Sequence, residues 1–170
     1  MKFSLAMKSV LPAAVFGFLA LGVGSTPSVA VTATATNTFA VTATVVATCQ
    51  VSATALGFGN YTGVVHPASS TVSVTCTDTT PYNVGLSAGL ATGATVTARS
   101  MTGPASALLG YGLFQDAGHT LNWGQTAGTD TVAGIGNGAA QPITVYGQIP
   151  ASEFVAPGAY ADTITATVTY

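Results

Sequence analysis

Residues 36–51 read TNTFAVTATVVATCQV, and the alternation of side chains in this stretch decides the fold class. Every second residue from Val31 to Val51 is apolar apart from Asn37, while the positions between them are mostly threonine. Successive side chains of a β-strand point to opposite faces, so this period of two predicts a strand with one apolar face. The stretch therefore predicts β structure whose apolar face needs a partner to cover it.

This alternating stretch is too long to lie within one domain. About 20 extended residues would span roughly 65 Å, whereas a folded unit of about 125 residues has a diameter of very roughly 36 Å. No Gly or Pro lies between Val31 and Val51 to make a sharp bend easy. We therefore expect the home domain to begin near Thr48 and the part that ends near Val45 to leave it.

The chain after Ala30 shows the same period of two in short runs between Gly, Pro, Asn and Asp, and no helical spacing. Several short strands favour a sandwich over an open sheet, so the predicted class is all-β. The glycine-rich residues 124–138 are predicted to form a long loop. The predicted strands are residues 38–44, 48–53, 71–76, 82–87, 95–101, 108–115, 142–149 and 159–170.

The first 30 residues have the features of a signal peptide. Lys2 and Lys8 precede an apolar run of about 15 residues, and small residues at 28–30 suit a signal peptidase. The run is shorter than the roughly 18 to 20 residues that a membrane helix needs. We expect export and cleavage after Ala30, with a retained membrane helix as the alternative.

The exported portion carries little charge. Arg99 is its only lysine or arginine, against five acidic residues. Such a chain cannot neutralise phosphates, which excludes nucleic acid and anionic membranes as partners. A neutral surface gives little repulsion between copies, which is typical of proteins that assemble or lie in a fibre.

The two cysteines, Cys49 and Cys76, both lie in the exported portion, where an oxidising compartment makes a structural disulfide the default. Each shares a strand face with valines, so both sulfurs are expected to point inward. A metal pair or a reactive thiol is the alternative, but further ligands or a basic neighbour are missing from the pattern. We predict a Cys49–Cys76 disulfide.

The alternating run AYADTITATVTY at residues 159–170 ends the chain, and its apolar face is broken only by Asp162. A strand with an uncovered edge is an open template for another strand. The simplest way to cover both the extension and this edge is for the extension of one copy to complete the sheet of the next. Such a contact does not close on itself and propagates as a fibre.

Short motifs in a fixed order support a family resemblance. They are VVATCQVSA at 45–53, FGNY at 58–61, SVTC at 73–76, YNVGLSAG at 82–89, ARSM at 98–101, LGYGLFQD at 109–116, NWG at 122–124, VYGQIP at 145–150 and GAYADTITATVTY at 158–170. Through these motifs the chain resembles the spore coat protein U family, the Csu-type pilins of archaic chaperone-usher pili. Each motif is weak alone, and their order and spacing make the match specific.

The resemblance implies an incomplete immunoglobulin-like β-sandwich that lacks its final strand and is completed by donor-strand complementation. It divides the chain into a signal peptide at 1–30, a donor-strand extension at 31–46 and a pilin domain at 47–170. Phe39, Val41, Ala43 and Val45 correspond to the donor side chains, and Asn37 departs from a fully apolar donor. The edge of the acceptor groove corresponds to Tyr160, Ile164, Ala166, Val168 and Tyr170.

The function that this resemblance implies is that of a structural, non-enzymatic pilin without cofactor, which serves adhesion or biofilm formation. Its implied partners are neighbouring pilin subunits, a periplasmic chaperone and an outer-membrane usher, and no membrane after signal cleavage. It would be exported through the periplasm to the cell surface, as a shaft or adaptor subunit. The alternatives are a secreted spore or cyst coat protein, and a glycan-binding module that completes its own fold.

Other residues that suggest chemistry are given structural roles. Asp116 and His119 lie in a turn-like stretch without a third ligand, so a solvated hairpin turn is expected there. His66 is expected in a loop, and Trp123 is expected to pack in the core instead of stacking on a sugar. The glycines of residues 134–138 precede neither a lysine nor a helix, which excludes a phosphate-binding loop.

Overall fold

The computed structural model describes residues 31–170, so the predicted signal peptide lies outside the described residues. The chain divides between Thr42 and Ala43 into two units. Residues 31–48 form no helix or strand, and each of them is exposed. Within residues 31–170, the structure has no helix that is long and apolar enough to cross a membrane.

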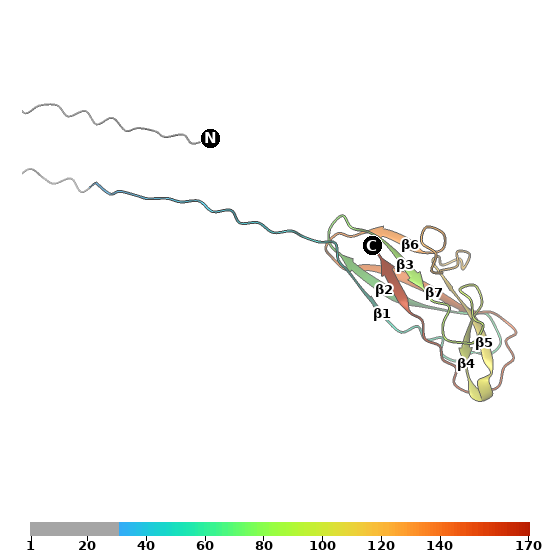
Figure 1. The fold of residues 1–170 in the computed structure, drawn as a ribbon. Helices are drawn as coiled ribbons and strands as arrows, with labels where there is room; N and C mark the ends of the chain where they lie inside the picture. The colour runs from blue at the N-terminus through green and yellow to red at the C-terminus, as the bar shows by residue number, and fades with distance from the viewer. Residues whose placement is uncertain (1–30) are drawn as a thin grey trace, which may run out of the picture. The chain divides into compact units, whose positions relative to one another are not determined.

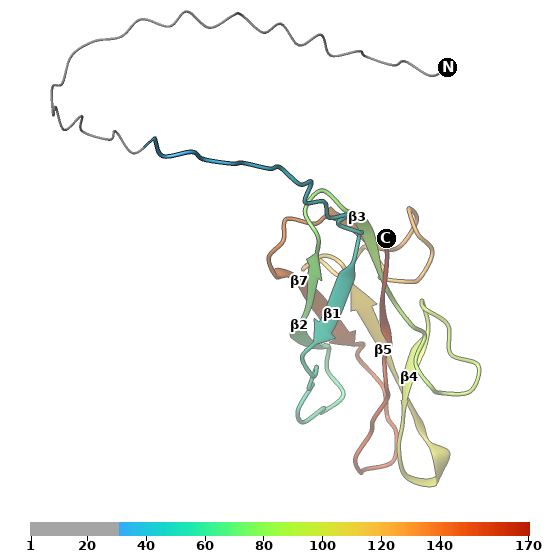
Figure 2. The ribbon, with the colours of Figure 1, turned by 60° about the vertical axis from the view of Figure 1, so that its left-hand side comes forward.

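Two antiparallel sheets form the folded part, which confirms the predicted all-β sandwich (Figure 1). One sheet has the strand order β1-β2-β7-β5-β4, and the other has the order β6-β3-β8. The strands are β1 (Cys49–Ala53), β2 (His66–Cys76), β3 (Pro81–Leu86), β4 (Arg99–Thr102), β5 (Leu108–Phe114), β6 (Val132–Ile135), β7 (Gln141–Ile149) and β8 (Ala166–Thr169). In Figure 2, β1 starts at the end of the sandwich where the chain terminates, and the hairpin between β4 and β5 lies at the other end.

Two predictions from the sequence are wrong. Residues 124–138 are not a continuous loop, because β6 lies within them and pairs with β3. Gly134 interrupts the strand pattern there, since a Cβ at this position would lie 2.4 Å from the Tyr82 ring. His66 is not in a loop either: it is the first residue of β2 and lies opposite Ile149 of β7.

Four predicted strands differ in extent. The strand predicted at 71–76 begins earlier, at His66, and the one predicted at 95–101 begins later, at Arg99. Residues 38–44 form no strand in the described chain, because a strand needs a hydrogen-bonded neighbour. Of residues 159–170, only those of β8 are paired along a ladder, with β3. The last two differences occur where the described chain lacks a strand beside the segment.

The core lies between the two sheets. Trp123 is fully buried, and its Nε1–H donates to the carbonyl oxygen of Val84 at 2.8 Å, which confirms its predicted packing role. Cys49 and Cys76 lie directly opposite each other on β1 and β2 and form the predicted disulfide. The bridge closes a loop of 27 residues, and a loop of that length stabilises a fold by about 3 kcal/mol.

Arg99 is buried to 1% exposure, although it is the only lysine or arginine beyond residue 30. Its guanidinium donates to four main-chain carbonyls and to no carboxylate. The acceptors are Ser87 (2.8 Å), Val96 (2.6 Å), Leu86 (3.0 Å) and Trp123 (2.7 Å). Burial lowers the pKa of Arg99 from its ordinary value. The side chain therefore joins β4 to the end of β3 and to the segment that carries the buried tryptophan.

We expect Arg99→Met to lower the free energy of unfolding by about 3 kcal/mol or more, because it leaves buried carbonyls without donors. Arg99→Lys is the matched variant. It keeps the charge, but a single ammonium group cannot reach all four carbonyls that the planar guanidinium contacts. Urea unfolding curves of the three chains measure the effect. A lysine variant as stable as the native chain would show that the fork geometry is unimportant.

Candidate functional site

β8 leaves one backbone edge without a strand, because it is the last strand of its sheet. On its other edge, Thr165 accepts from the N–H of Ser87 at 3.0 Å, and Ala161 exchanges two hydrogen bonds with Thr102. Backbone groups of successive strand residues point to opposite edges. The N–H and C=O groups of the even-numbered residues from 162 to 168 therefore face the open edge.

β1 is the last strand of the other sheet, and its outer edge is open in the same way. Its even-numbered residues face β2, as the hydrogen bond from Thr54 N–H to Thr71 O at 2.9 Å shows for the residue that follows the strand. The backbone groups of Cys49, Val51 and Ala53 consequently face outward. Within residues 31–170, β1 and β8 thus each present a row of backbone donors and acceptors without a strand partner.

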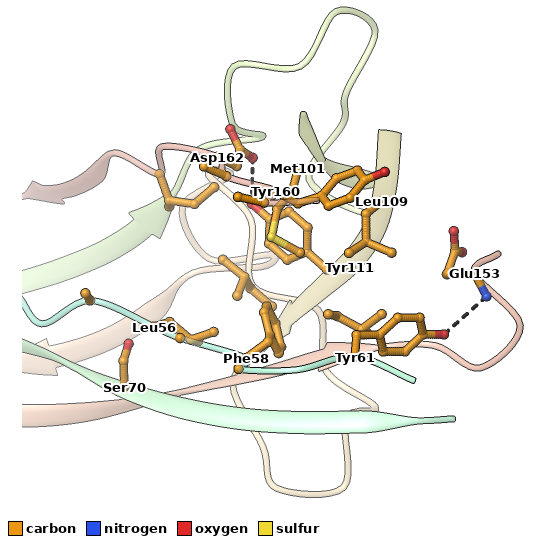
Figure 3. Close-up of a pocket in the computed structure, with 18 of the residues that line it drawn as sticks. Leu56, Phe58, Tyr61, Ser70, Met101, Leu109, Tyr111, Glu153, Tyr160 and Asp162 are labelled. Atoms are coloured by element: carbon orange, nitrogen blue, oxygen red, sulfur yellow. Dashed lines mark hydrogen bonds between the residues drawn. The ribbon is translucent and has the colours of Figure 1, made fainter. Parts of the chain in front are cut away.

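A cleft of about 1330 Å³ lies between residues 53–63 on one side and residues 153–166 on the other (Figure 3). Its lining includes buried core side chains of both sheets, namely Leu86, Leu109, Leu113, Val145 and Ile149. These five side chains are at most 5% exposed and form the floor of the cleft. Half-buried apolar residues, among them Leu56, Phe58 and Ile164, form its sides.

The structure places the predicted groove residues in three different settings. Tyr160, Ile164 and Ala166 line the cleft. Val168 packs against the core opposite Val84 of β3 and does not line the cleft. Tyr170 is 58% exposed and lies outside the lining.

The predicted donor side chains are all exposed. Phe39, Val41 and Val45 are 86%, 84% and 86% exposed, and Ala43 is exposed as well. The role of these four residues as donors stays a prediction. Large apolar side chains with such exposure are typical of a surface that binds another protein.

The cleft wall at residues 53–63 was not identified as part of the site from the sequence. Beyond Thr54 it has no strand ladder, and side chains hold it in place. His66 Nε2 lies 2.6 Å from the carbonyl oxygen of Phe58, and the Tyr61 hydroxyl donates to Pro150 O at 2.5 Å. The FGNY motif at 58–61 was the available signal, since it contains an aromatic pair within a segment that lacks strand alternation.

Gly147 of β7 makes room for this wall. A Cβ at Gly147 would lie 2.9 Å from a methyl carbon of Leu56 and 3.0 Å from the ring of Phe58. The ring of Phe58 also contacts Tyr111 in an edge-to-face arrangement, with centroids 6.1 Å apart. These contacts keep the wall at a fixed distance from the floor of the cleft.

Asp162 interrupts the apolar face of the last strand, and the structure explains why. The Tyr111 hydroxyl donates to its Oδ2 at 2.6 Å, and the N–H of Leu90 donates to its Oδ1 at 2.8 Å. Burial and the hydrogen bond to Asp162 raise the pKa of Tyr111 well above its usual value. The carboxylate is thus satisfied within the chain and ties the unpaired part of the last strand to β5.

Asp116 lies in the turn after β5, as the sequence predicted, and accepts hydrogen bonds from the N–H groups of Thr120 and Leu121. His119 is not solvated as predicted: it is half-buried, with its ring edge-to-face against Phe114 and Tyr146. Across residues 31–170, no group of three or more His, Cys, Asp and Glu side chains is arranged to hold a metal ion.

Comparisons with known proteins agree with the motif pattern. The Spore Coat Protein U domain model matches residues 35–167. Protein U of Myxococcus xanthus is 36% identical to this chain over 128 residues, which cover 68% of this chain and 71% of that protein. A solved structure of the CsuC–CsuE chaperone–tip adhesion subunit pre-assembly complex, from the archaic chaperone-usher Csu pili of Acinetobacter baumannii, is similar with a TM-score of 0.57 and 26% identity. That similarity covers 75% of this chain, which spans 40% of the matched chain's length.

We expect Tyr111→Phe to make unfolding less sensitive to pH above about pH 10, where an ordinary tyrosine loses its proton. The folded chain keeps the Tyr111 proton to higher pH than the unfolded chain does, because its pKa is raised. This contribution is therefore complete below about pH 10 and is lost as the pH rises. Urea midpoints from pH 8 to pH 11.5 measure it. Tyr170→Phe, which removes an exposed phenol, is the control; equal pH slopes for Tyr111→Phe and the native chain would contradict the prediction.

Proposed function

Because the chain belongs to the Spore Coat Protein U domain family, we propose that it is a structural subunit of a surface fibre assembled by the chaperone-usher pathway. Two findings support this proposal. The family model covers residues 35–167, and the similar solved structure comes from a complex of chaperone-usher pili. In this role the protein is a building block and has no enzymatic activity.

The observation that carries the proposal is the presence, in one chain, of an open cleft and an exposed alternating extension. The cleft is bordered by the unpaired backbone edge of residues 162–166, and the open edge of β1 reaches it at Ala53, so a strand placed there would gain backbone hydrogen bonds. The extension offers an apolar face formed by Phe39, Val41, Ala43 and Val45. In donor-strand complementation these side chains would enter the cleft of the next subunit, and the threonines would face outward.

The energetics favour a preformed cleft as the acceptor. Full burial of Phe39, Val41 and Val45 would contribute about 1.5–3 kcal/mol each. Ordering the extension opposes this gain, so the backbone hydrogen bonds along both edges are needed as well. The hydrogen bonds of Tyr61 and His66 hold the cleft wall in place before binding. Less conformational entropy is then lost when a strand binds.

The remaining steps of the proposal concern partners and location. A subunit with open strand edges and half-buried apolar cleft walls is prone to aggregation, so a periplasmic chaperone would supply a strand until assembly. An outer-membrane usher would then exchange that strand for the extension of the next subunit and deliver the fibre to the cell surface. Adhesion or biofilm formation is the proposed role, in the shaft or as an adaptor.

A coat protein of a spore or cyst is the second candidate. The description of the matching family model, Spore Coat Protein U domain, favours it. The same strand exchange would build such a coat, so the two functions differ in where the polymer is deposited. Immunogold labelling of whole cells and of purified spores or cysts distinguishes fibres at the cell surface from a continuous coat.

We expect Phe39→Asp to block polymerisation, because a charged side chain cannot enter the apolar cleft without a large desolvation cost. Thr42→Asp is the matched control, since it places the same charge on the outward face of the extension. SDS-resistant ladders on gels of surface extracts measure polymer length. Ladders from the Phe39→Asp chain would refute the donor assignment, and a stable monomer without any chaperone would favour the self-completed module.

A further inference from the structure

Met101 is the only methionine of the chain beyond residue 30. Both cysteines of residues 31–170 are joined in the disulfide, so this part of the chain has no free thiol. Sulfur side chains are common targets of oxidants, and a methionine thioether is converted to a polar sulfoxide. Met101 is therefore the one sulfur side chain of residues 31–170 that is open to this reaction, and its surroundings decide what the reaction does.

The side chain of Met101 faces the cleft from β4. Successive residues of a strand point to opposite faces, and Met101 shares the inward face of β4 with the buried Arg99. It lies opposite Leu109 of β5, packs against the core and is half-buried. Figure 3 shows it among the side chains that line the cleft. The thioether thus borders the space that is proposed to receive a strand.

The residues after Met101 anchor this side of the cleft to the last strand. Thr102 exchanges two main-chain hydrogen bonds with Ala161, at 2.9 and 3.1 Å. A Cβ at Gly103 would overlap the ring of Tyr160, so this ring lies against the main chain two residues beyond Met101. Met101 is therefore held beside the segment whose open backbone edge runs along the cleft.

The tyrosine hydroxyls of the cleft lining already donate their protons within the chain. The acceptors are Pro150 O for Tyr61, Asp162 Oδ2 for Tyr111 (2.6 Å) and Ala156 O for Tyr160 (2.7 Å). A sulfoxide oxygen needs a hydrogen-bond donor when it is buried, because an unpaired polar group is costly away from water. At position 101 this oxygen would be hydrated while the cleft is open. It would have none of these hydroxyls as a donor once an apolar strand covers it.

We propose that Met101 is an oxidation site, and that its sulfoxide prevents the cleft from accepting an apolar strand. The oxidant is a peroxide. The sulfur attacks one peroxide oxygen, the S–O bond forms as the O–O bond breaks, the sulfur loses two electrons, and hydrogen peroxide is reduced to water. A strand that is already in the cleft covers the sulfur, so the reaction is confined to subunits that have not assembled. This inference rests on the proposed function, because it assigns a regulation of the same cleft.

The full exported chain carrying Phe39→Asp, which disables its own extension as a donor, tests the proposal. It is compared with the same chain carrying Met101→Leu, which has no thioether, or Met101→Gln, which places a polar group there without an oxidant. Each chain is treated with hydrogen peroxide in urea, refolded, and titrated with a fluorescent peptide, NTFAVTATVVA, residues 37–47. Because the exported chain has one methionine, its intact mass reports the extent of oxidation directly.

We expect peroxide to weaken peptide binding to the Met101 chain about tenfold, because the peptide covers an unpaired polar oxygen. Methionine sulfoxide reductase should restore the affinity. Met101→Leu should show the same affinity before and after peroxide, and Met101→Gln should bind the peptide more weakly than Met101→Leu. When peroxide is added after folding, a seated peptide should slow the oxidation of Met101 about tenfold relative to the open cleft, because it covers the sulfur.

The outcomes separate this inference from the proposed function. If peroxide leaves peptide binding to the Met101 chain unchanged, or weakens binding to Met101→Leu equally, the oxidation site is refuted and the strand-accepting cleft stands. The same conclusion follows if a seated peptide does not slow oxidation. It also follows if the sulfoxide lowers the urea midpoint of the chain without peptide, since the sulfur would then act in the core and not in the cleft. If the untreated chain binds no peptide, the proposed function fails, and this inference fails with it.

Discussion

The main constraint on this molecule is a set of backbone hydrogen bonds that residues 31–170 leave unmade. β1 and β8 each end a sheet, and one edge of each carries N–H and C=O groups without a strand partner among these residues. Most proteins cover or shorten such edges, because they attract other strands. Here the open edge of residues 162–166 runs along one apolar cleft, and the open edge of β1 reaches the same cleft at Ala53.

The cleft persists in the described chain because its walls are held by side chains and not by ladders. Tyr61 and His66 fix one wall, and Asp162 fixes the other through Tyr111 and Leu90. Hydrogen bonds of this kind resist collapse of the two walls onto each other without filling the backbone positions that a new strand needs. The backbone N–H and C=O groups along residues 162–166 therefore stay accessible from the cleft.

The period of two predicted most strands correctly, because alternation reports burial on one face directly. β6 was missed because glycines interrupt its sequence pattern. Gly134 within the strand leaves room for the Tyr82 ring, and Gly136 just after it leaves room for Thr77 O. Close contacts between distant parts of the chain select these glycines, and they leave no periodic pattern in the sequence. The extension was predicted as a strand from the same alternation, but strand structure also needs a neighbouring backbone, which the described chain does not provide.

The candidate site was predictable only on the side of the last strand. Tyr160, Ile164 and Ala166 share its apolar face, and all three line the cleft. The opposite wall has no alternation, and Glu153 lies in a loop whose sequence does not indicate where its carboxylate is placed. The position of Glu153 beside Gly110 follows from how the segment after β7 crosses β5, and only the three-dimensional structure gives this.

The disulfide between Cys49 and Cys76 has a mechanical consequence. Cys49 is the first residue of β1, so tension applied along the extension enters the domain at this residue. The covalent bond passes the load to β2, an interior strand paired with both β1 and β7. Peeling β1 away one hydrogen bond at a time is thereby prevented at the point of pulling. A pull on residues 31–48 is thus resisted first by a covalent bond and by the two neighbours of β2, and the sandwich is protected at the point where the extension leaves it.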